Sequence, residues 1–231
     1  MGINYTLQNF DVDAATVVVV KNLMLQPSAG NEGDACAPAG SGPRFVYTPW
    51  QFLNPSQRAE ESFRYENAIY VGLRRHDSPE SERPRLYPVF VGRSYVLVIG
   101  VHDISLQELQ EKKGGESYVE IYAPSAMVDP VPVDIDWYLG GLVVAEAHRV
   151  GITRHVCSGQ RALFQPDDGV LLFLAVPPNH ISYRTYEPEE FSLATPYKAP
   201  SNVTEVKVTL EYDDSGLAVY AFSHRNALGN G

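Results

Sequence analysis

Two histidines, a glutamate and a cysteine near position 150 are the residues of this sequence whose types suggest chemistry. The four are Glu146, His148, His155 and Cys157. If the chain turns back at Val150-Gly151, the alternation of side chains along strands places all four on one face of a hairpin. Two imidazoles, a carboxylate and a thiolate suit Zn²⁺, or Fe²⁺ if the thiolate does not bind the ion. Such an ion acidifies bound water, which favours a metal-dependent hydrolase or an oxygenase-like enzyme.

The segment that carries these residues has a second interpretation as a helix. A helix over residues 134–151 would begin after an Asp136 cap and stop at Gly151. Gly140-Gly141 argues against a helix interior, whereas the stretch AEAHR argues for one. The helix removes the metal site, because His148 becomes a terminal or surface residue and Cys157 a small core residue. The two interpretations remain open from sequence alone.

Other patterns of titratable residues are weaker. Carboxylate pairs occur at Asp134/Asp136, Asp167/Asp168 and Glu189/Glu190. None has the spacing of an EF-hand loop. The chain also lacks a Walker loop, a GxGxxG fingerprint, an HExxH motif and a GxSxG elbow. We therefore expect no cofactor, with zinc or iron at the first cluster as the alternative.

Aromatic residues form a further group of candidates. The chain has 14 Tyr, 9 Phe and 2 Trp. Five of them lie in or beside proline-rich, poorly patterned segments: Tyr47, Trp50, Tyr183, Tyr186 and Tyr197. Loop aromatics stack on sugars or fill protein interfaces at low entropic cost. They therefore predict a surface that binds carbohydrate or protein.

The elements that must position these residues are mostly strands. Residues 16–25 are nearly continuous in β-branched and apolar character, which is typical of a central strand. Residues 89–101 and an alternating C-terminal hairpin at residues 205–222 add further strands. The sequence predicts one mainly β domain over residues 1–231, an antiparallel β-sandwich or barrel-like fold with two or three short helices. A long flexible loop is expected at residues 26–43, where Gly and Pro are frequent.

Two of the expected helices have readable start signals. Asn54 can cap a helix that begins with Pro55. Ser105 and Glu108 have the spacing of a capping box, and Gly114 follows two lysines as a stop signal. These local patterns predict helices from residue 55 and from residue 105.

Charge limits the partners. The formal net charge of -10 disfavours binding to nucleic acid, and the Arg74-Arg75 pair is interpreted as solvated loop charge. The sequence shows neither a secretory signal nor an apolar run long enough for a transmembrane segment. We therefore expect a cytoplasmic protein, with non-classical release as an alternative.

Three functions are compatible with these patterns. The first is a non-catalytic β-sandwich protein that binds protein or carbohydrate, or assembles into a homo-oligomer, through loop aromatics and exposed strand edges. The alternative is the metal-dependent enzyme with its site on a hairpin over residues 142–157. A third is a membrane-acting toxin subunit.

Overall fold

The computed structural model describes residues 2–13, 16–26, 44–65, 68–79, 84–100, 103–109, 117–125, 132–140, 147–166, 169–175, 195–200 and 202–226. Throughout these residues the chain forms strands and turns, and no helix occurs. The strands form several mostly antiparallel sheets, and none of the sheets described closes into a barrel. The mainly β character predicted from sequence is therefore confirmed.

One sheet has the strand order β16-β15-β1-β4. Its strands are β1 (Ile3–Asn9), β4 (Glu60–Tyr65), β15 (Val203–Tyr212) and β16 (Ala218–Asn226). The predicted C-terminal hairpin is β15 and β16, in which Val206, Val208 and Leu210 are buried and Glu205 and Lys207 are exposed. Asp213 closes the turn, because its carboxylate accepts the backbone N–H groups of Ser215 and Leu217. This hairpin is confirmed.

The largest sheet has the order β14-β13-β2-β12-β9-β7-β8, and β3 also pairs with β2. The strands are β2 (Thr16–Gln26), β3 (Arg44–Leu53), β7 (Ser94–Ile99), β8 (Ile104–Glu108), β9 (Val119–Tyr122), β12 (Arg161–Pro166), β13 (Val170–Ala175) and β14 (Thr195–Tyr197). Strand β2 pairs with β3 along most of its length, with β13 in its first half and with β12 in its second half. It is the central strand that its apolar run predicts.

The third sheet positions the candidate site and has the order β11-β10-β5-β6. Its strands are β5 (Ile69–Arg75), β6 (Leu86–Val89), β10 (Val133–Leu139) and β11 (His148–Val156). Strand β10 is buried on both faces. Ile135 and Trp137 lie on one face, and the carboxylates of Asp134 and Asp136 lie on the other.

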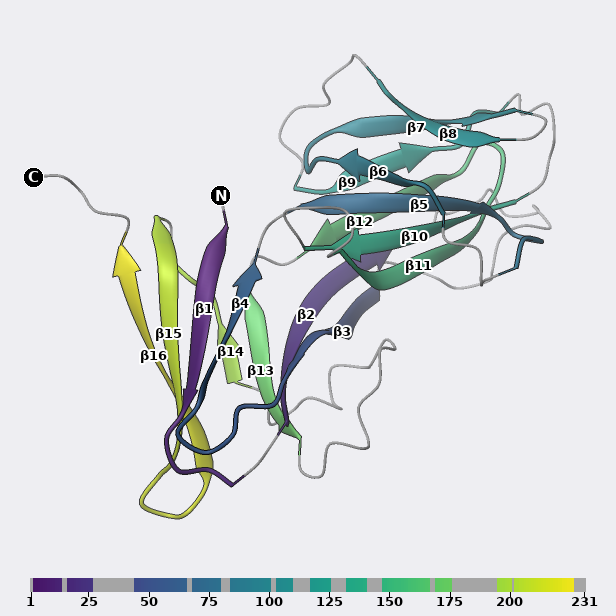
Figure 1. Cartoon of the computed structure of the whole chain (residues 1–231). Helices are drawn as coiled ribbons and strands as arrows, with labels where there is room; N and C mark the ends of the chain where they lie inside the picture. Colours follow the sequence, from purple (N-terminus) through teal and green to yellow (C-terminus); the bar gives the residue numbers. More distant parts are fainter. Residues whose placement is uncertain are drawn as a thin grey trace, which may run out of the picture.

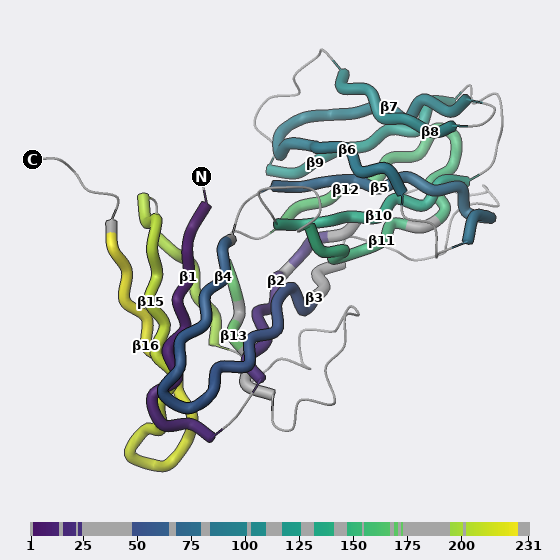
Figure 2. The backbone as a smooth tube through the Cα atoms, in the orientation of Figure 1, coloured from purple at the N-terminus to yellow at the C-terminus, as the bar shows by residue number. Residues whose placement is uncertain are grey.

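A single buried cluster of apolar side chains joins the three sheets. Figures 1 and 2 show β2 and β3 running between the group β1, β4, β13 to β16 and the group β5 to β12. The Trp137 ring stacks on Phe164 of β12 with 4.6 Å between ring centroids. Tyr197 of β14 stacks on Phe222 of β16 at 4.2 Å. These ring contacts hold the sheets against one another.

The predicted helices at Asn54 and Ser105 are wrong. The chain after Asn54 forms a turn and then strand β4, and Ser105 lies in strand β8. Strand β8 pairs with β7, so that Leu106 lies opposite Leu97. A capping box stabilises a helix end by about 1 kcal/mol, whereas a paired strand forms a ladder of hydrogen bonds and buries apolar side chains. Tertiary pairing therefore overrides the local signal.

The segment 134–151 is neither the predicted helix nor the predicted hairpin. Apart from Gly140 and Ala147, its described residues belong to β10 and β11, and β11 runs through Val150-Gly151 without a turn. Strand β11 pairs with β10, so the expected register across Val150-Gly151 is wrong. Apart from Gln26, the predicted loop at residues 26–43 lies outside the described residues, as do residues 141–146. None of the described residues forms a helix with the length and apolar character needed to cross a bilayer.

Candidate metal-binding site

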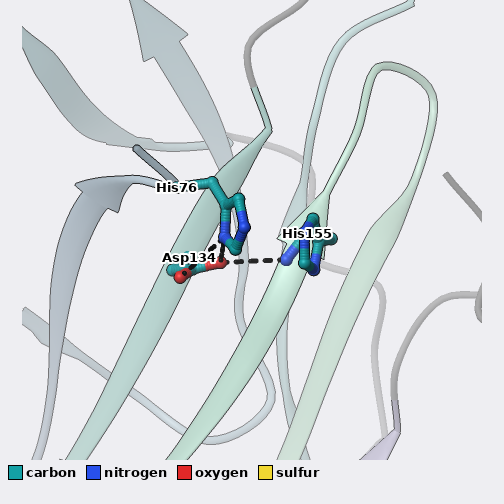
Figure 3. Close-up of side chains that lie close together, drawn as sticks. All are labelled: His76, Asp134 and His155. Atoms are coloured by element: carbon teal, nitrogen blue, oxygen red, sulfur yellow. Dashed lines mark hydrogen bonds and ion pairs between the residues drawn. The ribbon is translucent and has the colours of Figure 1, made fainter. Parts of the chain in front are cut away.

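Three side chains at one end of the third sheet converge in Figure 3: His76, Asp134 and His155. His76 directly follows β5 and donates its backbone N–H to the carbonyl of Pro132, just before β10. Asp134 is the second residue of β10, and His155 is the last but one of β11. Because β10 lies between β5 and β11, the three residues meet at one end of the sheet.

A β-bulge in β11 determines where His155 lies. Val133 pairs with Val156 and Ile135 pairs with Thr153, so two residues of β11 lie opposite Asp134 alone. His155 has a φ of 55°, in the left-handed region that non-glycine residues seldom adopt. The extra residue lets Thr153 and Val156 both be buried, although they are three positions apart. The bulge thus leaves the His155 side chain exposed beside Asp134.

The Asp134 carboxylate holds this arrangement together. Its Oδ1 accepts the backbone N–H of His155 at 3.0 Å. His76 Nδ1 lies 3.1 Å from Oδ1 and 3.2 Å from Oδ2. The Asp134 side chain is 4% exposed, whereas that of His76 is 36% exposed. A carboxylate with little access to water is therefore flanked by two imidazoles that solvent can reach.

The neighbouring carboxylate on the same face has a different partner. Asp136 accepts Nε and Nη2 of Arg74 at 2.7 and 3.0 Å, and both side chains are at most 5% exposed. Arg149 approaches the same carboxylate at 3.7 Å. The interpretation of Arg74 as a solvated loop charge is wrong, because Arg74 is buried and neutralises Asp136. This face of β10 thus carries the buried Arg74–Asp136 ion pair, and the His76, Asp134 and His155 cluster lies at its end.

The geometry of the cluster suits a small divalent ion. The candidate ligand atoms of His76, Asp134 and His155 all lie within 4.8 Å of one another. Ligands of zinc with bonds of about 2.0–2.1 Å lie roughly 3.4 Å apart. The two imidazole rings lie close together, with centroids 3.6 Å apart and planes inclined at 41°. Two imidazoles and one carboxylate suit Zn²⁺ or Fe²⁺.

The four ligands expected from sequence are not brought together among the described residues. Glu146 lies outside them, and His148 is the first residue of β11. His148 and His155 are seven positions apart on that strand, a separation of about 23 Å at 3.3 Å per residue. Cys157 is buried beyond the bulge and donates its backbone N–H to Gln160 Oε1. His155 is therefore still a candidate ligand, but the residues beside it are His76 and Asp134 and not the other expected ligands.

The five aromatic residues that the sequence suggested as binding residues lie in different parts of the chain. Trp50 is not a loop residue, because it lies in β3, is 1% exposed and donates its indole N–H to the carbonyl of Leu139. Tyr197 lies in β14 against Phe222, with its hydroxyl buried. Tyr47 belongs to β3, and Tyr183 and Tyr186 lie outside the described residues. The expected loop location is wrong for Tyr47, Trp50 and Tyr197, which lie in strands, and Trp50 is also buried. A binding role for the four tyrosines stays a prediction.

Sequence reasoning missed His76 as a candidate ligand and considered Asp134 only as one of several carboxylate pairs. A signal for Asp134 was present, because two aspartates alternate with large apolar residues in VDIDWYL. Such a pattern indicates a strand whose second face carries buried charge and therefore needs partners. His76 carries no comparable signal, since only the β5–β10 register brings it to Asp134.

The chain was also compared with known proteins. No family model, no curated protein and no solved structure matches it.

Proposed function

We propose that this protein binds one divalent transition-metal ion, Zn²⁺ or Fe²⁺, through His76, Asp134 and His155. The observation that carries the proposal is the convergence of three ligand atoms from three adjacent chain segments within 4.8 Å. The carboxylate is held by the backbone N–H of His155, so one ligand is oriented before the ion arrives. Backbone hydrogen bonds to a ligand of this kind lower the cost of organising a site.

The ligand set supports an open coordination sphere. Three protein ligands leave at least one position of a four-coordinate ion for water, which is the arrangement of catalytic rather than structural zinc sites. Both imidazoles are accessible to solvent, which supports an open position that water can reach. A water bound there would be acidified by the ion, and metal-dependent hydrolysis or oxygenation is the activity that this site would support.

We also propose that the sheets are the layers of a β-sandwich. Stacking of Trp137 on Phe164 supports this arrangement, because it packs the third sheet against the largest one. The site then lies on the face of β10 that points away from the shared core, where the charged residues Arg74 and Asp136 also lie.

The test is metal binding by purified protein from which any histidine tag has been removed. Titration calorimetry with Zn²⁺, together with metal analysis after dialysis, should give one equivalent for the wild type. His76→Ala and His155→Ala should each weaken binding by at least about 100-fold, since each removes a ligand. Circular dichroism of each variant shows whether the fold is retained.

His148→Ala is the matched control, because His148 lies on the same strand but at its other end. It should bind zinc like the wild type. Two results would overturn the proposal: a wild type that binds no zinc, or binding that His148→Ala weakens and His155→Ala does not.

A further inference from the structure

Strand β16 forms one edge of the sheet β16-β15-β1-β4 and differs from the other edges of the fold. Its nine residues, AVYAFSHRN, include no proline, no glycine and no acidic residue. Its pairing with β15 is regular from Glu205↔Arg225 to Tyr212↔Ala218. A long, regular edge without such protection is a template for pairing with another strand.

The other edge strands in the described part of the chain carry features that prevent such pairing. Proline occurs in three of them, as Pro49 in β3, Pro88 in β6 and Pro196 in β14. Strand β11 is interrupted by register shifts, β8 has only five residues, and β4 carries Glu60, Glu61 and Arg64. Proline, irregularity, short length and charge are the features that proteins use to protect edges. Strand β16 shows two of the four features, and only near its end: the charge of Arg225 and a register shift of its pairing with β15 between Arg225 and Asn226.

The hydrogen-bond pattern shows which groups of β16 point away from β15. Phe10 of the chain after β1 donates its N–H to the carbonyl of Leu210, so the backbone groups of Leu210 point to the β1 side. In an antiparallel pair, two directly opposite residues either bond to each other or both turn their backbone groups away from the pair. The residue of β16 opposite Leu210 therefore turns its N–H and C=O groups away from β15. Leu210 lies opposite Tyr220. The backbone N–H and C=O groups of Tyr220, and of every second residue from it, therefore lie along the outer edge, namely Ala218, Phe222, His224 and Asn226.

We propose that two copies of this chain pair through β16 in antiparallel fashion, about a two-fold axis at Phe222. This centre aligns the whole strand with its copy, because Phe222 is the middle residue of Ala218–Asn226. Phe222 lies opposite its own copy as a hydrogen-bonded pair. Tyr220 then lies opposite His224 of the second copy, and all outward backbone groups have partners. A two-fold interface of this kind closes on itself and leaves no further edge at β16.

The side chains of β16 are compatible with this register. Ala221 lies opposite Ser223 of the other copy, and Val219 lies opposite Arg225, so no two like charges face each other. Ala221, Ser223 and Arg225 are exposed in the single chain. Phe222 stacks on Tyr197 of its own chain, which keeps its ring on the core side while its backbone stays at the edge.

The test uses two double variants and measures mass in solution by analytical ultracentrifugation. Ala221→Glu with Ser223→Glu places two carboxylates opposite each other twice across the axis. Ala221→Lys with Ser223→Glu places a lysine opposite a carboxylate instead. Both substitutions are at exposed positions, and a carboxylate at position 223 lies next to Lys207 on β15 in either variant. The two variants thus differ mainly in the charge that faces the other copy.

We expect the wild type to form a dimer that dissociates on dilution, the Glu/Glu variant to be a monomer and the Lys/Glu variant to remain a dimer. A wild type of monomer mass up to about 1 mM would overturn the proposal. A dimer that the Glu/Glu variant does not weaken, or that the Lys/Glu variant weakens equally, would overturn it as well, because the interface or the register would be different. Circular dichroism confirms that each variant is folded.

Discussion

The backbone N–H of His155 donates to the carboxylate of Asp134 at 3.0 Å, inside the β-bulge that places two residues of β11 opposite Asp134. The residue in the left-handed conformation of the bulge is therefore also the one whose imidazole lies beside the carboxylate. Bulges often re-aim a side chain at a functional site. Here the bulge brings two candidate ligands, Asp134 and His155, together.

The left-handed conformation of His155 predicts different effects for two substitutions. His155→Asn should change the free energy of unfolding by no more than about 0.5 kcal/mol, because Asn tolerates positive φ. His155→Val should cost about 1–2 kcal/mol, since a β-branched side chain clashes in this region. Urea denaturation measures both values. Equal stability of the two variants would contradict the backbone conformation. Both variants should bind zinc at least about 100-fold more weakly than the wild type, because each lacks the His155 imidazole.

The hydrogen bond from His155 predicts that Asp134→Ala lowers the free energy of unfolding more than Asp134→Asn does. Asparagine keeps an oxygen that can accept the His155 N–H, so the cost should be about 1 kcal/mol or less. Alanine leaves that donor without its acceptor and should cost about 1–3 kcal/mol. Denaturant unfolding of both variants in metal-free buffer tests this. If the two cost the same, the carboxylate stabilises the fold by its charge and not by this hydrogen bond.

The buried pair of Arg74 and Asp136 predicts a strongly non-additive result. Arg74→Ala should destabilise the protein by about 3–5 kcal/mol, because it leaves a carboxylate of 1% exposure without its main cation. The double variant Arg74→Met with Asp136→Leu should be more stable than Arg74→Ala alone, since neither charge of this pair is left without its partner. Thermal and urea unfolding give the comparison. A double variant less stable than the single one would contradict this reasoning.

The buried tyrosine hydroxyls predict opposite effects for two Tyr→Phe substitutions. Tyr220→Phe should raise the free energy of unfolding by about 1 kcal/mol, because its hydroxyl is buried with no partner among the described residues. Tyr95→Phe is the matched control, since its hydroxyl accepts the N–H of Phe90 at 2.9 Å. That variant should lose about 1 kcal/mol. A loss of stability in Tyr220→Phe would indicate a partner for the hydroxyl.

Burial also predicts how stability depends on alkaline pH. It raises the pKa of Tyr220 and of Tyr5 well above the usual value for tyrosine. The unfolded chain therefore releases these protons near pH 10 while the folded chain keeps them, so stability is full below about pH 10 and falls above it. Unfolding in urea between about pH 8 and about pH 11 measures the fall, and Tyr220→Phe should show a smaller one. An equal fall in both would show that Tyr220 does not contribute.

Sequence patterns with a local cause predicted much of the fold. The alternation of Val206, Val208 and Leu210 with charged residues located β15, and the apolar run of β2 indicated a central strand. The signals at Asn54 and Ser105 were also local, but they predicted helices wrongly. A helix start is worth little free energy compared with pairing to a distant strand.

The sequence by itself determined that the protein is mainly β, acidic and rich in buried aliphatic strands, because two-residue periodicity and composition are properties of short segments. It also indicated that His155 belongs among the candidate ligands. Only the tertiary structure decided which residues accompany it. His76, Asp134 and His155 are far apart in the chain and meet through the order β11-β10-β5. One extra residue in β11 then changes which face the side chains beyond it occupy. The periodicity of a single strand does not reveal which distant strands pair with it, so these partners could not be read from the sequence.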